Sequence, residues 1–374
     1  MSNISRAITL YQPRQVEVGI GAIQRLNDWA RNHKRILVIA TTHTKGFVER
    51  LKLSGDIRVF ADIPPEPDTS ALNAALAQAR AIKPDLVIGL GGGSVMDVAK
   101  LVAALWDGDH TLDDVVGPNR VNGRKSALAQ VATTSGTGSE AGTRALITDR
   151  ETHAKKAVES PFLLADIAIL DPELTVSVPP AVTAATGIDA MAHCVEAFTN
   201  IRAHDLIDSY ARMGMTLVGK YLVRAVQDGT DLEARTGMML ASYYGGICLG
   251  PVNTAAGHAL AYPLGTQLNL PHGLANAIIF PHVLAYNLPV CREKTAEIQT
   301  ALGLSPAADE DELRKSAYQF CQDLGVEMRL SAHGANKDDL PAWASEAHAI
   351  RRLMDNNPRE MSEEDVLNIY LNAF

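Results

Sequence analysis

Short apolar runs alternate with longer segments of helical spacing through the first half of the chain. A short run rich in valine and isoleucine has the length of a buried strand, whereas alanine-rich segments with apolar residues three and four apart are typical of helices. Buried strands that alternate with helices form a parallel sheet covered on both faces. We therefore predict strands at residues 35–40, 57–60, 85–90, 127–133 and 166–171, and helices at residues 70–82 and 94–105.

The segments ALITD (145–149) and AKKAVES (154–160) flank the polar link RETH, and we predict a β-hairpin there. The pattern changes at the Pro179–Pro180 pair, beyond which nearly every segment has helical periodicity. A chain of 374 residues is also longer than one hydrophobic core usually holds. We therefore predict an α/β domain in residues 1–178 and an all-helical domain in residues 179–374.

Composition narrows the class of protein. Hydrophobic residues make up 47% of the chain. The net charge is -9 and the sequence has no long basic run, which argues against nucleic acid or an anionic membrane as the main partner. The four cysteines form no C-x-x-C pair, so a zinc knuckle or a disulfide framework is not expected. The N-terminal stretch has no apolar signal-peptide core, and no apolar run has the length of a membrane span. We expect a cytoplasmic protein.

The stretch DLVIGLGGGSVMDVAK joins a predicted strand to a predicted helix through Gly91, Gly92 and Gly93. Glycines let the backbone turn tightly and approach a ligand, and the N–H groups at the start of a helix, near Ser94, favour a phosphate. An ordinary glycine turn is the alternative, because the spacing is not G-x-G-x-x-G. The position between strand and helix favours phosphate binding.

A second loop, TTSGTGSE, follows the strand that ends at Thr133 and offers five hydroxyl groups around Gly136 and Gly138. Two such loops after strands of one sheet line its carboxyl edge, where nucleotides bind in α/β folds. The two loops together predict a nucleotide site.

The helical half contains a pattern that suits a metal. Asp189 and His193 are four residues apart in TGIDAMAHCVEAF, on one face of a predicted helix, and His258 and His272 lie in GHALAYPLGTQLNLPHG. One carboxylate and three imidazoles suit Fe(II), Zn(II) or a similar divalent ion. The alternative for each residue alone is a histidine packed in a core, and we keep that interpretation for His282.

Five motifs give the chain a resemblance to a known family: GGGSVMDVAK, TTSGTGSE, GIDAMAHCVEAF, GHALAYPLG and PHGLANAIIFPHVLAYN. In this order they resemble those of the iron-containing (group III) alcohol dehydrogenases, and the resemblance runs from YQPRQVEVGIGAIQRL to NPREMSEEDVLNIYLNAF. It implies an α/β N-terminal nucleotide-binding domain followed by an all-α C-terminal metal-binding domain, the fold also found in dehydroquinate synthase-like enzymes.

The resemblance also implies roles for single residues. It implies a divalent metal, Fe(II) or Zn(II), held by Asp189, His193, His258 and His272, and it implies NAD or NADP as the second cofactor. It gives catalytic roles to His258 and Tyr262. The implied cofactor contacts are Thr41, Gly91, Gly92, Gly93, Ser94, Asp97, Thr133, Thr134, Thr137, Leu146, Lys155 and Leu174.

Two positions depart from the common family pattern. Many members have a second histidine where this chain has Tyr262, and a phenol is the poorer base at neutral pH. Many members have aspartate at the end of the strand 35–40, where it holds the adenosine ribose, whereas this chain has Thr41. The missing carboxylate predicts that NADP is tolerated.

The function implied is hydride transfer between an alcohol or aldehyde and NAD(P), assisted by a metal that acts as a Lewis acid. The expected partners are that small substrate and a second copy of the chain in a homodimer. The alternatives are a specialised relative such as maleylacetate reductase or hydroxyacid–oxoacid transhydrogenase, a non-redox enzyme resembling dehydroquinate synthase, and an inactive nucleotide-binding regulator.

Overall fold

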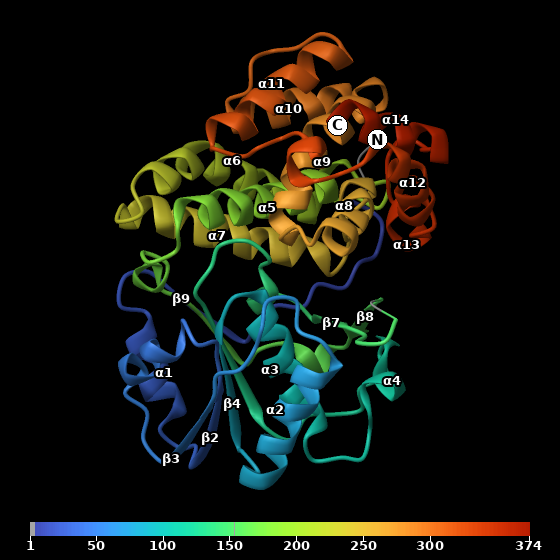
Figure 1. Cartoon of the computed structure of the whole chain (residues 1–374). Helices are drawn as coiled ribbons and strands as arrows, with labels where there is room; N and C mark the ends of the chain where they lie inside the picture. Colours follow the sequence, from blue (N-terminus) through green and yellow to red (C-terminus); the bar gives the residue numbers. More distant parts are fainter. Residues whose placement is uncertain (1–3, 153) are drawn as a thin grey trace. The chain divides into compact units, whose positions relative to one another are not determined.

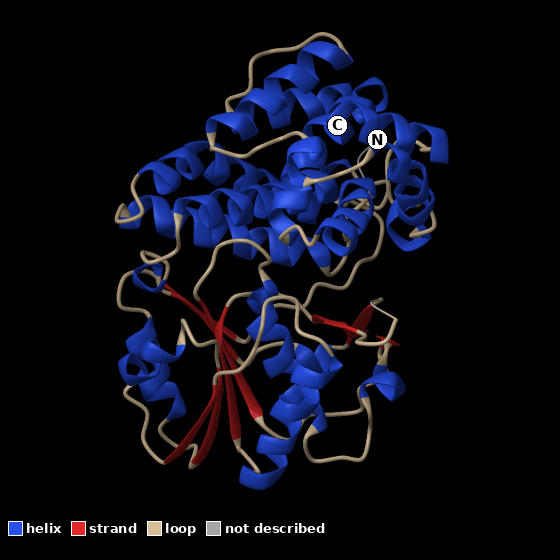
Figure 2. Ribbon diagram, viewed as in Figure 1, coloured by secondary structure: helices blue, strands red, loops and turns tan. Residues whose placement is uncertain are grey.

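The computed structural model of the chain describes residues 4–152 and 154–374. It divides into two compact units, one formed by Leu10–Ser177 and the other by Val178–Phe374 with the described part of Met1–Thr9 (Figure 1). The first unit is α/β and the second is all-helical, which confirms the predicted fold class (Figure 2). The described residues before Leu10 group with the helical unit.

A six-stranded parallel sheet forms the centre of the α/β unit. Its strands, in spatial order, are β1 (Gln15–Val18), β9 (Ile167–Leu170), β6 (Ala127–Ala132), β4 (Leu86–Gly91), β2 (Arg35–Ile39) and β3 (Asp56–Phe60). The helices of this unit are α1 (Ile23–Ala30), α2 (Thr69–Ile82), α3 (Gly93–Leu105) and the short α4 (Leu112–Val115). All five predicted strands of the sheet and both predicted helices are present.

Alternation along β2 explains why both faces of the sheet are covered. Successive side chains of a strand point to opposite faces. Ile36 and Val38 pack into one buried cluster with residues of α1, whereas Leu37 and Ile39 pack into another with residues of α2 and α3. Both faces therefore exclude water, which accounts for the continuous apolar runs in the sequence.

The predicted hairpin forms β7 (Arg144–Thr148) and β8 (Lys155–Glu159), which pair antiparallel. With β5 (Gly117–Pro118) they make a separate three-stranded sheet. The last residue of the link RETH, at position 153, lies outside the described residues. Among the strands and α-helices described in this unit, β1, α1, α4 and β5 were not predicted.

The helical unit begins at α5 (Pro180–Thr199), where Pro180 takes the first helical position, a place that costs no hydrogen bond. Helices α6, α7 and α9 pack against α5. The other helices are α6 (Asp205–Gln227), α7 (Leu232–Leu249), α8 (Ala256–Leu268), α9 (His272–Asn287), α10 (Arg292–Leu302), α11 (Glu310–Asp323), α12 (Leu340–His348), α13 (Arg351–Met354) and α14 (Glu363–Ala373). Short 3-10 helices lie at Lys45–Leu51, Ser139–Ala141, Pro161–Leu163, Pro172–Leu174, Leu288–Val290, Leu330–His333 and Lys337–Asp339.

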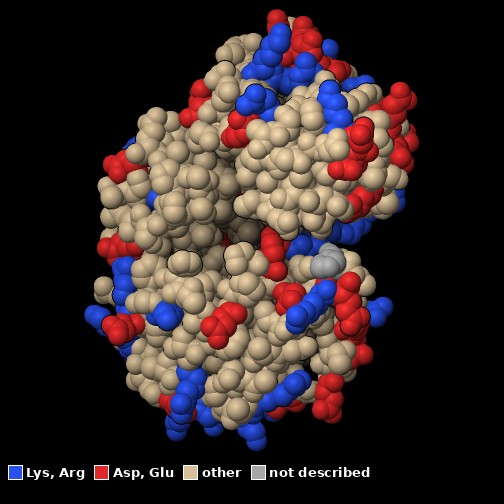
Figure 3. Space-filling model, viewed as in Figure 1, with Lys and Arg blue, Asp and Glu red and all other residues tan. Residues whose placement is uncertain are grey.

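One segment of the described chain, His272–Val290, is long and apolar enough to cross a membrane, but 72% of its most apolar window is buried inside the fold. Burial of this kind is typical of a core helix. On the face shown in Figure 3, basic and acidic side chains are interspersed, so that face presents no broad basic surface to a polyanion.

Candidate active site

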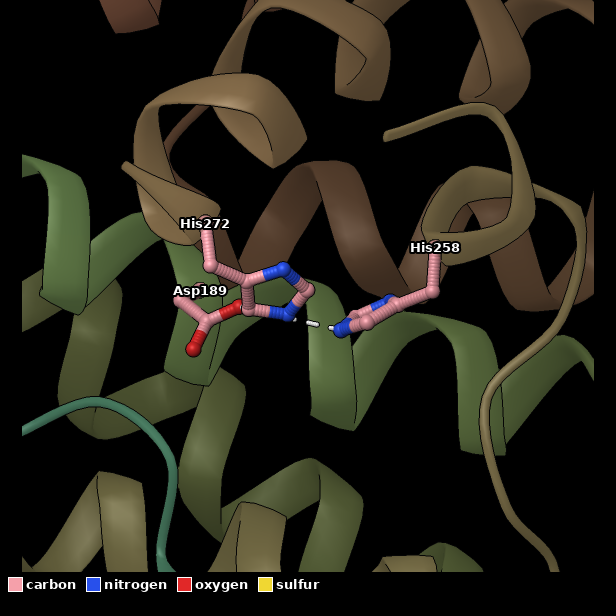
Figure 4. Close-up of side chains that lie close together, drawn as sticks. All are labelled: Asp189, His258 and His272. Atoms are coloured by element: carbon pink, nitrogen blue, oxygen red, sulfur yellow. Dashed lines mark ion pairs between the residues drawn. The ribbon is translucent and has the colours of Figure 1, made fainter. Parts of the chain in front are cut away.

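Three helices of the helical unit bring one carboxylate and three imidazoles together. Figure 4 shows three of these side chains, Asp189, His258 and His272. Asp189 and His193 are one helical turn apart on α5, His258 lies on α8, and His272 is the first residue of α9. Oδ1 of Asp189 lies 3.7 Å from Nε2 of both His258 and His272, and 3.9 Å from Nε2 of His193. The rings of His193 and His258 stack with centroids 4.8 Å apart.

These separations fit the ligand atoms of a shared divalent ion. They are longer than a hydrogen bond, and they approach the distance of about 3.4 Å between neighbouring ligand atoms of a tetrahedral site with bonds of about 2.1 Å. Asp189, His258 and His272 offer one ligand atom each within 4.8 Å of one another. Asp189, His193 and His258 are buried, so the donor atoms are shielded from water. The set of nitrogen and carboxylate donors suits Zn(II) or Fe(II).

The Asn276 side chain marks the point on which three of the proposed ligand atoms converge. Its amide nitrogen donates to Oδ1 of Asp189 at 2.7 Å and lies 3.2 Å from Nε2 of His258 and 3.3 Å from Nε2 of His272. The amide nitrogen is thus within 3.3 Å of three of the proposed ligand atoms. The same three atoms would surround an ion at this point, so the residues present fit a metal.

The charges of the cluster depend on one another. Burial acts to raise the pKa of Asp189, but the neighbouring histidines His193, His272 and His258 outweigh it and hold that pKa well below its usual range. Burial lowers the pKa of His193 to about 4, so its ring is neutral at pH 7. Burial acts in the same direction on His258, but Glu196 and Asp189 outweigh it and raise the pKa of His258.

Two further residues of the cluster, Glu196 and Asn276, were not predicted from the sequence. Glu196 is buried on α5, and its Oε1 lies 2.6 Å from Nδ1 of His258. Helical spacing could have indicated that both residues lie near a ligand, because Glu196 follows His193 by three residues and Asn276 follows His272 by four. Spacing places such residues on the same face as a ligand but does not show which side chain of another helix they meet.

Tyr262 lies on α8, one turn beyond His258. Its ring centroid is 6.0 Å from that of His272. The guanidinium of Arg352 lies 5.6 Å from the Tyr262 ring centroid and donates a hydrogen bond to the hydroxyl at 3.3 Å. The phenol is therefore beside the histidine cluster and has a cationic neighbour. His282 is buried within α9, and neither of its ring nitrogens has a hydrogen-bond partner among the described residues.

The two predicted phosphate loops touch each other in the α/β unit. Gly92 is the N-cap of α3 and Gly93 its first residue, directly after β4. A Cβ atom on Gly92 would lie 2.9 Å from Oγ1 of Thr134, and one on Gly93 would lie 2.6 Å from Cγ2 of Thr137. Backbone N–H of Thr133 also donates to the carbonyl of Gly91 at 3.1 Å. The loops after β4 and β6 thus form one surface with the start of α3, where Ser94 lies.

Asp97 connects α3 to the small sheet. One of its oxygens accepts a hydrogen bond from the Ser139 hydroxyl at 2.6 Å, and the other accepts from backbone N–H of Leu146 at 2.9 Å. The fully buried Lys100 donates to the same hydroxyl at 2.8 Å and to the carbonyl of Arg144 at 2.7 Å. Both Asp97 oxygens are engaged within the protein.

The remaining predicted cofactor contacts lie in different surroundings. Thr41 follows β2, and its hydroxyl accepts from backbone N–H of Thr44 at 3.1 Å. Lys155 donates to the Thr148 hydroxyl at 2.9 Å and pairs with Glu66. Leu174 is only 1% exposed and packs in the apolar cluster beside α1, so its side chain is part of the core.

Comparison with known proteins covers both units. The model of the family described as iron-containing alcohol dehydrogenase matches residues 13–172, and the C-terminal model of that family matches residues 183–374. Long-chain-alcohol dehydrogenase 1 of Geobacillus thermodenitrificans is 37% identical, over 97% of this chain and 95% of its own length. The NAD-dependent methanol dehydrogenase of Bacillus methanolicus is 29% identical, over 95% of this chain and 97% of its own length. The solved structure of a 1,3-propanediol oxidoreductase matches with a TM-score of 0.93 at 28% identity, covering 99% of this chain and all of that one (100%).

With the histidine cluster, these matches define a metal-dependent oxidoreductase that uses a nicotinamide cofactor. The chain belongs to the iron-containing alcohol dehydrogenase family, and it is an alcohol dehydrogenase or aldehyde reductase of that family. The resemblance drawn from the five motifs is confirmed. The family uses a divalent metal and NAD(P).

Proposed function

We propose that Asp189, His193, His258 and His272 bind one Fe(II) or Zn(II) ion, and that the enzyme interconverts primary alcohols and aldehydes with NAD or NADP. The observation that carries this proposal is the approach of three imidazole Nε2 atoms to one carboxylate oxygen, at 3.7 to 3.9 Å. When bound, the ion supplies Lewis acidity toward an alcohol or carbonyl oxygen. The names of relatives that act on long-chain alcohols and on methanol support a primary alcohol as the substrate class.

The residues of the chain prepare the site for that chemistry. Asp189 carries the negative charge that balances part of the charge of a divalent ion. The surrounding helices bury three of the four proposed ligands, which limits competing water. In alcohol oxidation, the carbinol carbon gives a hydride to C4 of the nicotinamide and its hydroxyl gives up a proton. We assign Tyr262, held by Arg352, to the hydrogen bonding of that hydroxyl.

We also propose that the loops after β4 and β6 bind the dinucleotide. Backbone N–H groups of Gly93 and Ser94 at the start of α3 suit the pyrophosphate, and the hydroxyls of Thr134 and Thr137 suit further polar groups of the cofactor. Asp97 acts on this surface indirectly by fixing α3, because its oxygens already accept hydrogen bonds from Ser139 and Leu146. Leu174 supports the same region from the core.

The proposal extends to assembly and location. All four cysteines are free, which fits a reducing compartment, and we propose the cytoplasm. We further propose a homodimer.

The test uses protein stripped of metal by a chelator and then loaded with Fe(II) or Zn(II). Primary alcohols of increasing length and the matching aldehydes are assayed at 340 nm with NAD and with NADP. We expect turnover that requires the metal, and we expect His272→Ala to lose more than about 100-fold, since even outer-shell partners of metal ligands are worth 10–100-fold. The control is His282→Leu, on the same helix.

Equal turnover with and without metal would contradict the proposal, and so would full metal occupancy in His272→Ala. Absence of any absorbance change at 340 nm with the metal-loaded protein would instead favour the non-redox, dehydroquinate synthase-like alternative.

A further inference from the structure

Glu196 is a buried carboxylate that contacts the histidine cluster on the side of His258 that is turned away from Asp189. It lies two helical turns after Asp189 and three residues after His193 on α5, so all three side chains share one face of the helix. Its Oε1 lies 2.6 Å from Nδ1 of His258, the ring nitrogen that is turned away from Asp189. The side chain is nearly buried, with 8% of the residue exposed.

We propose that Glu196 is a positioning residue that fixes the tautomer and the direction of the His258 ring for metal binding. This inference rests on the proposed metal site. A carboxylate only accepts hydrogen bonds, so Nδ1 of His258 must carry a proton toward it. The electron pair of Nε2 then points to the side where Oδ1 of Asp189 lies 3.7 Å away. Metal-binding histidines are commonly held in this way, and the partner also makes the ring a stronger ligand.

The second oxygen of Glu196 holds the backbone that carries His258. Oε2 accepts a hydrogen bond from backbone N–H of Ala255 at 2.5 Å and a longer one from backbone N–H of His258 at 3.4 Å. These groups lie at the start of α8, where N–H donors lack partners within the helix and where a negative charge is favoured. One carboxylate therefore fixes both the ring and the first turn of its helix.

The neighbouring glycine shows that little room is left around this contact. A Cβ atom on Gly257 would lie 2.6 Å from Oε1 of Glu196. The glycine that precedes His258 in the motif GHALAYPLG therefore lets the carboxylate approach the ring. This contact explains why glycine and histidine are adjacent at this point of the sequence.

The test measures metal affinity in the absence of nucleotide and substrate. Metal-free wild type and Glu196→Gln are titrated with Zn(II) against a chromophoric chelator, and the Co(II) forms are compared by visible absorption. A glutamine presents one amide NH₂ group where both carboxylate oxygens now accept, so it must oppose either the ring N–H or the backbone N–H groups. We expect the Kd for Zn(II) to rise about 10–100-fold and the Co(II) bands to shift.

The matched control is Asp208→Asn. Asp208 is a buried carboxylate on α6 that pairs with Lys294 at 2.7 Å and has no contact with the cluster among the described residues. We expect its Kd for Zn(II) to stay within about threefold of wild type, because residues without shared partners act independently. Cooperative thermal unfolding of both variants verifies that each has folded.

Double variants separate positioning from a merely structural role. If Glu196 acts through His258, then Glu196→Gln weakens Zn(II) binding little further in a His258→Ala background, but by its full factor in a His272→Ala background. Equal losses in both backgrounds, or an unchanged Kd in Glu196→Gln alone, would overturn the inference. The proposed function has a separate test in metal-dependent turnover, and a wild type that binds no divalent metal would overturn both.

Discussion

Thr41 illustrates how one uncharged side chain bears on the choice of cofactor. It lies two residues after the end of β2, and its hydroxyl and that of Thr44 lie 3.2 Å apart. The Thr44 hydroxyl donates in turn to the carbonyl of Leu90 at 2.8 Å, which ties this turn to the end of β4. The turn is therefore held by hydroxyls and carries no carboxylate at position 41. An acidic residue there binds the ribose 2′-OH of NAD and repels the 2′-phosphate of NADP.

We expect Thr41→Asp to lower the ratio of kcat/KM for NADP to that for NAD by about tenfold or more, since the new charge repels the 2′-phosphate. Thr42→Asp adds the same charge one residue further on, at an exposed position, and serves as the control. The ratio in the control should change by less than about threefold, because an exposed charge is screened by salt. If wild type discriminates against NADP as strongly as Thr41→Asp does, the strand end does not determine the cofactor.

At the scale of elements, strands β2, β4, β6 and β9 were predictable because each is buried on both faces and therefore forms an apolar run in the sequence. β1 was not, because its residues QVEV are half-exposed at the edge of the sheet and lack such a run. The candidate site was predictable in part. Asp189 and His193 share a helix, so their spacing alone puts them on one face, whereas their meeting with His258 and His272 requires the packing of α9 against both α5 and α8. Glu196 and Asn276 were missed for the same reason.

The two glycine loops yield a prediction that belongs to these elements. Gly93→Ala would place a Cβ atom 2.6 Å from Cγ2 of Thr137, so one loop must move. We expect the Kd for NAD(P) to rise at least about tenfold, and overpacking to cost about 1–3 kcal/mol of stability. Both quantities are measured on one preparation, by fluorescence titration and by denaturant unfolding.

The control for Gly93→Ala is Gly46→Ala. Gly46 lies in the short helix Lys45–Leu51 of the same unit, and a Cβ atom there would have no neighbour within 4 Å. The Gly46→Ala variant should bind NAD(P) with the Kd of wild type. A Gly93→Ala variant with wild-type cofactor affinity would contradict the view that contact between these loops shapes the dinucleotide site.

At the scale of the whole molecule, the candidate metal ligands and the candidate dinucleotide contacts belong to different compact units, each with its own buried core. A ligand stabilises the folded form of the unit that binds it, by about 2.7 kcal/mol at a free concentration of 100 times its Kd. Zn(II) alone should therefore slow amide hydrogen exchange mainly in α5, α8 and α9. NAD(P) alone should slow it mainly in the loops after β4 and β6.

Hydrogen exchange followed by mass spectrometry tests both halves of this last prediction on the wild-type chain. Each ligand also has its own control variant: His272→Ala should abolish the protection by Zn(II) but keep that by NAD(P), and Gly93→Ala should do the reverse. The reason is that each substitution alters the proposed binding site of one unit only: His272→Ala removes a metal ligand, and Gly93→Ala adds a Cβ atom against Thr137. Protection by Zn(II) that is confined to residues 10–177 would place the metal away from the histidine cluster, and would contradict the assignment of Asp189, His193, His258 and His272.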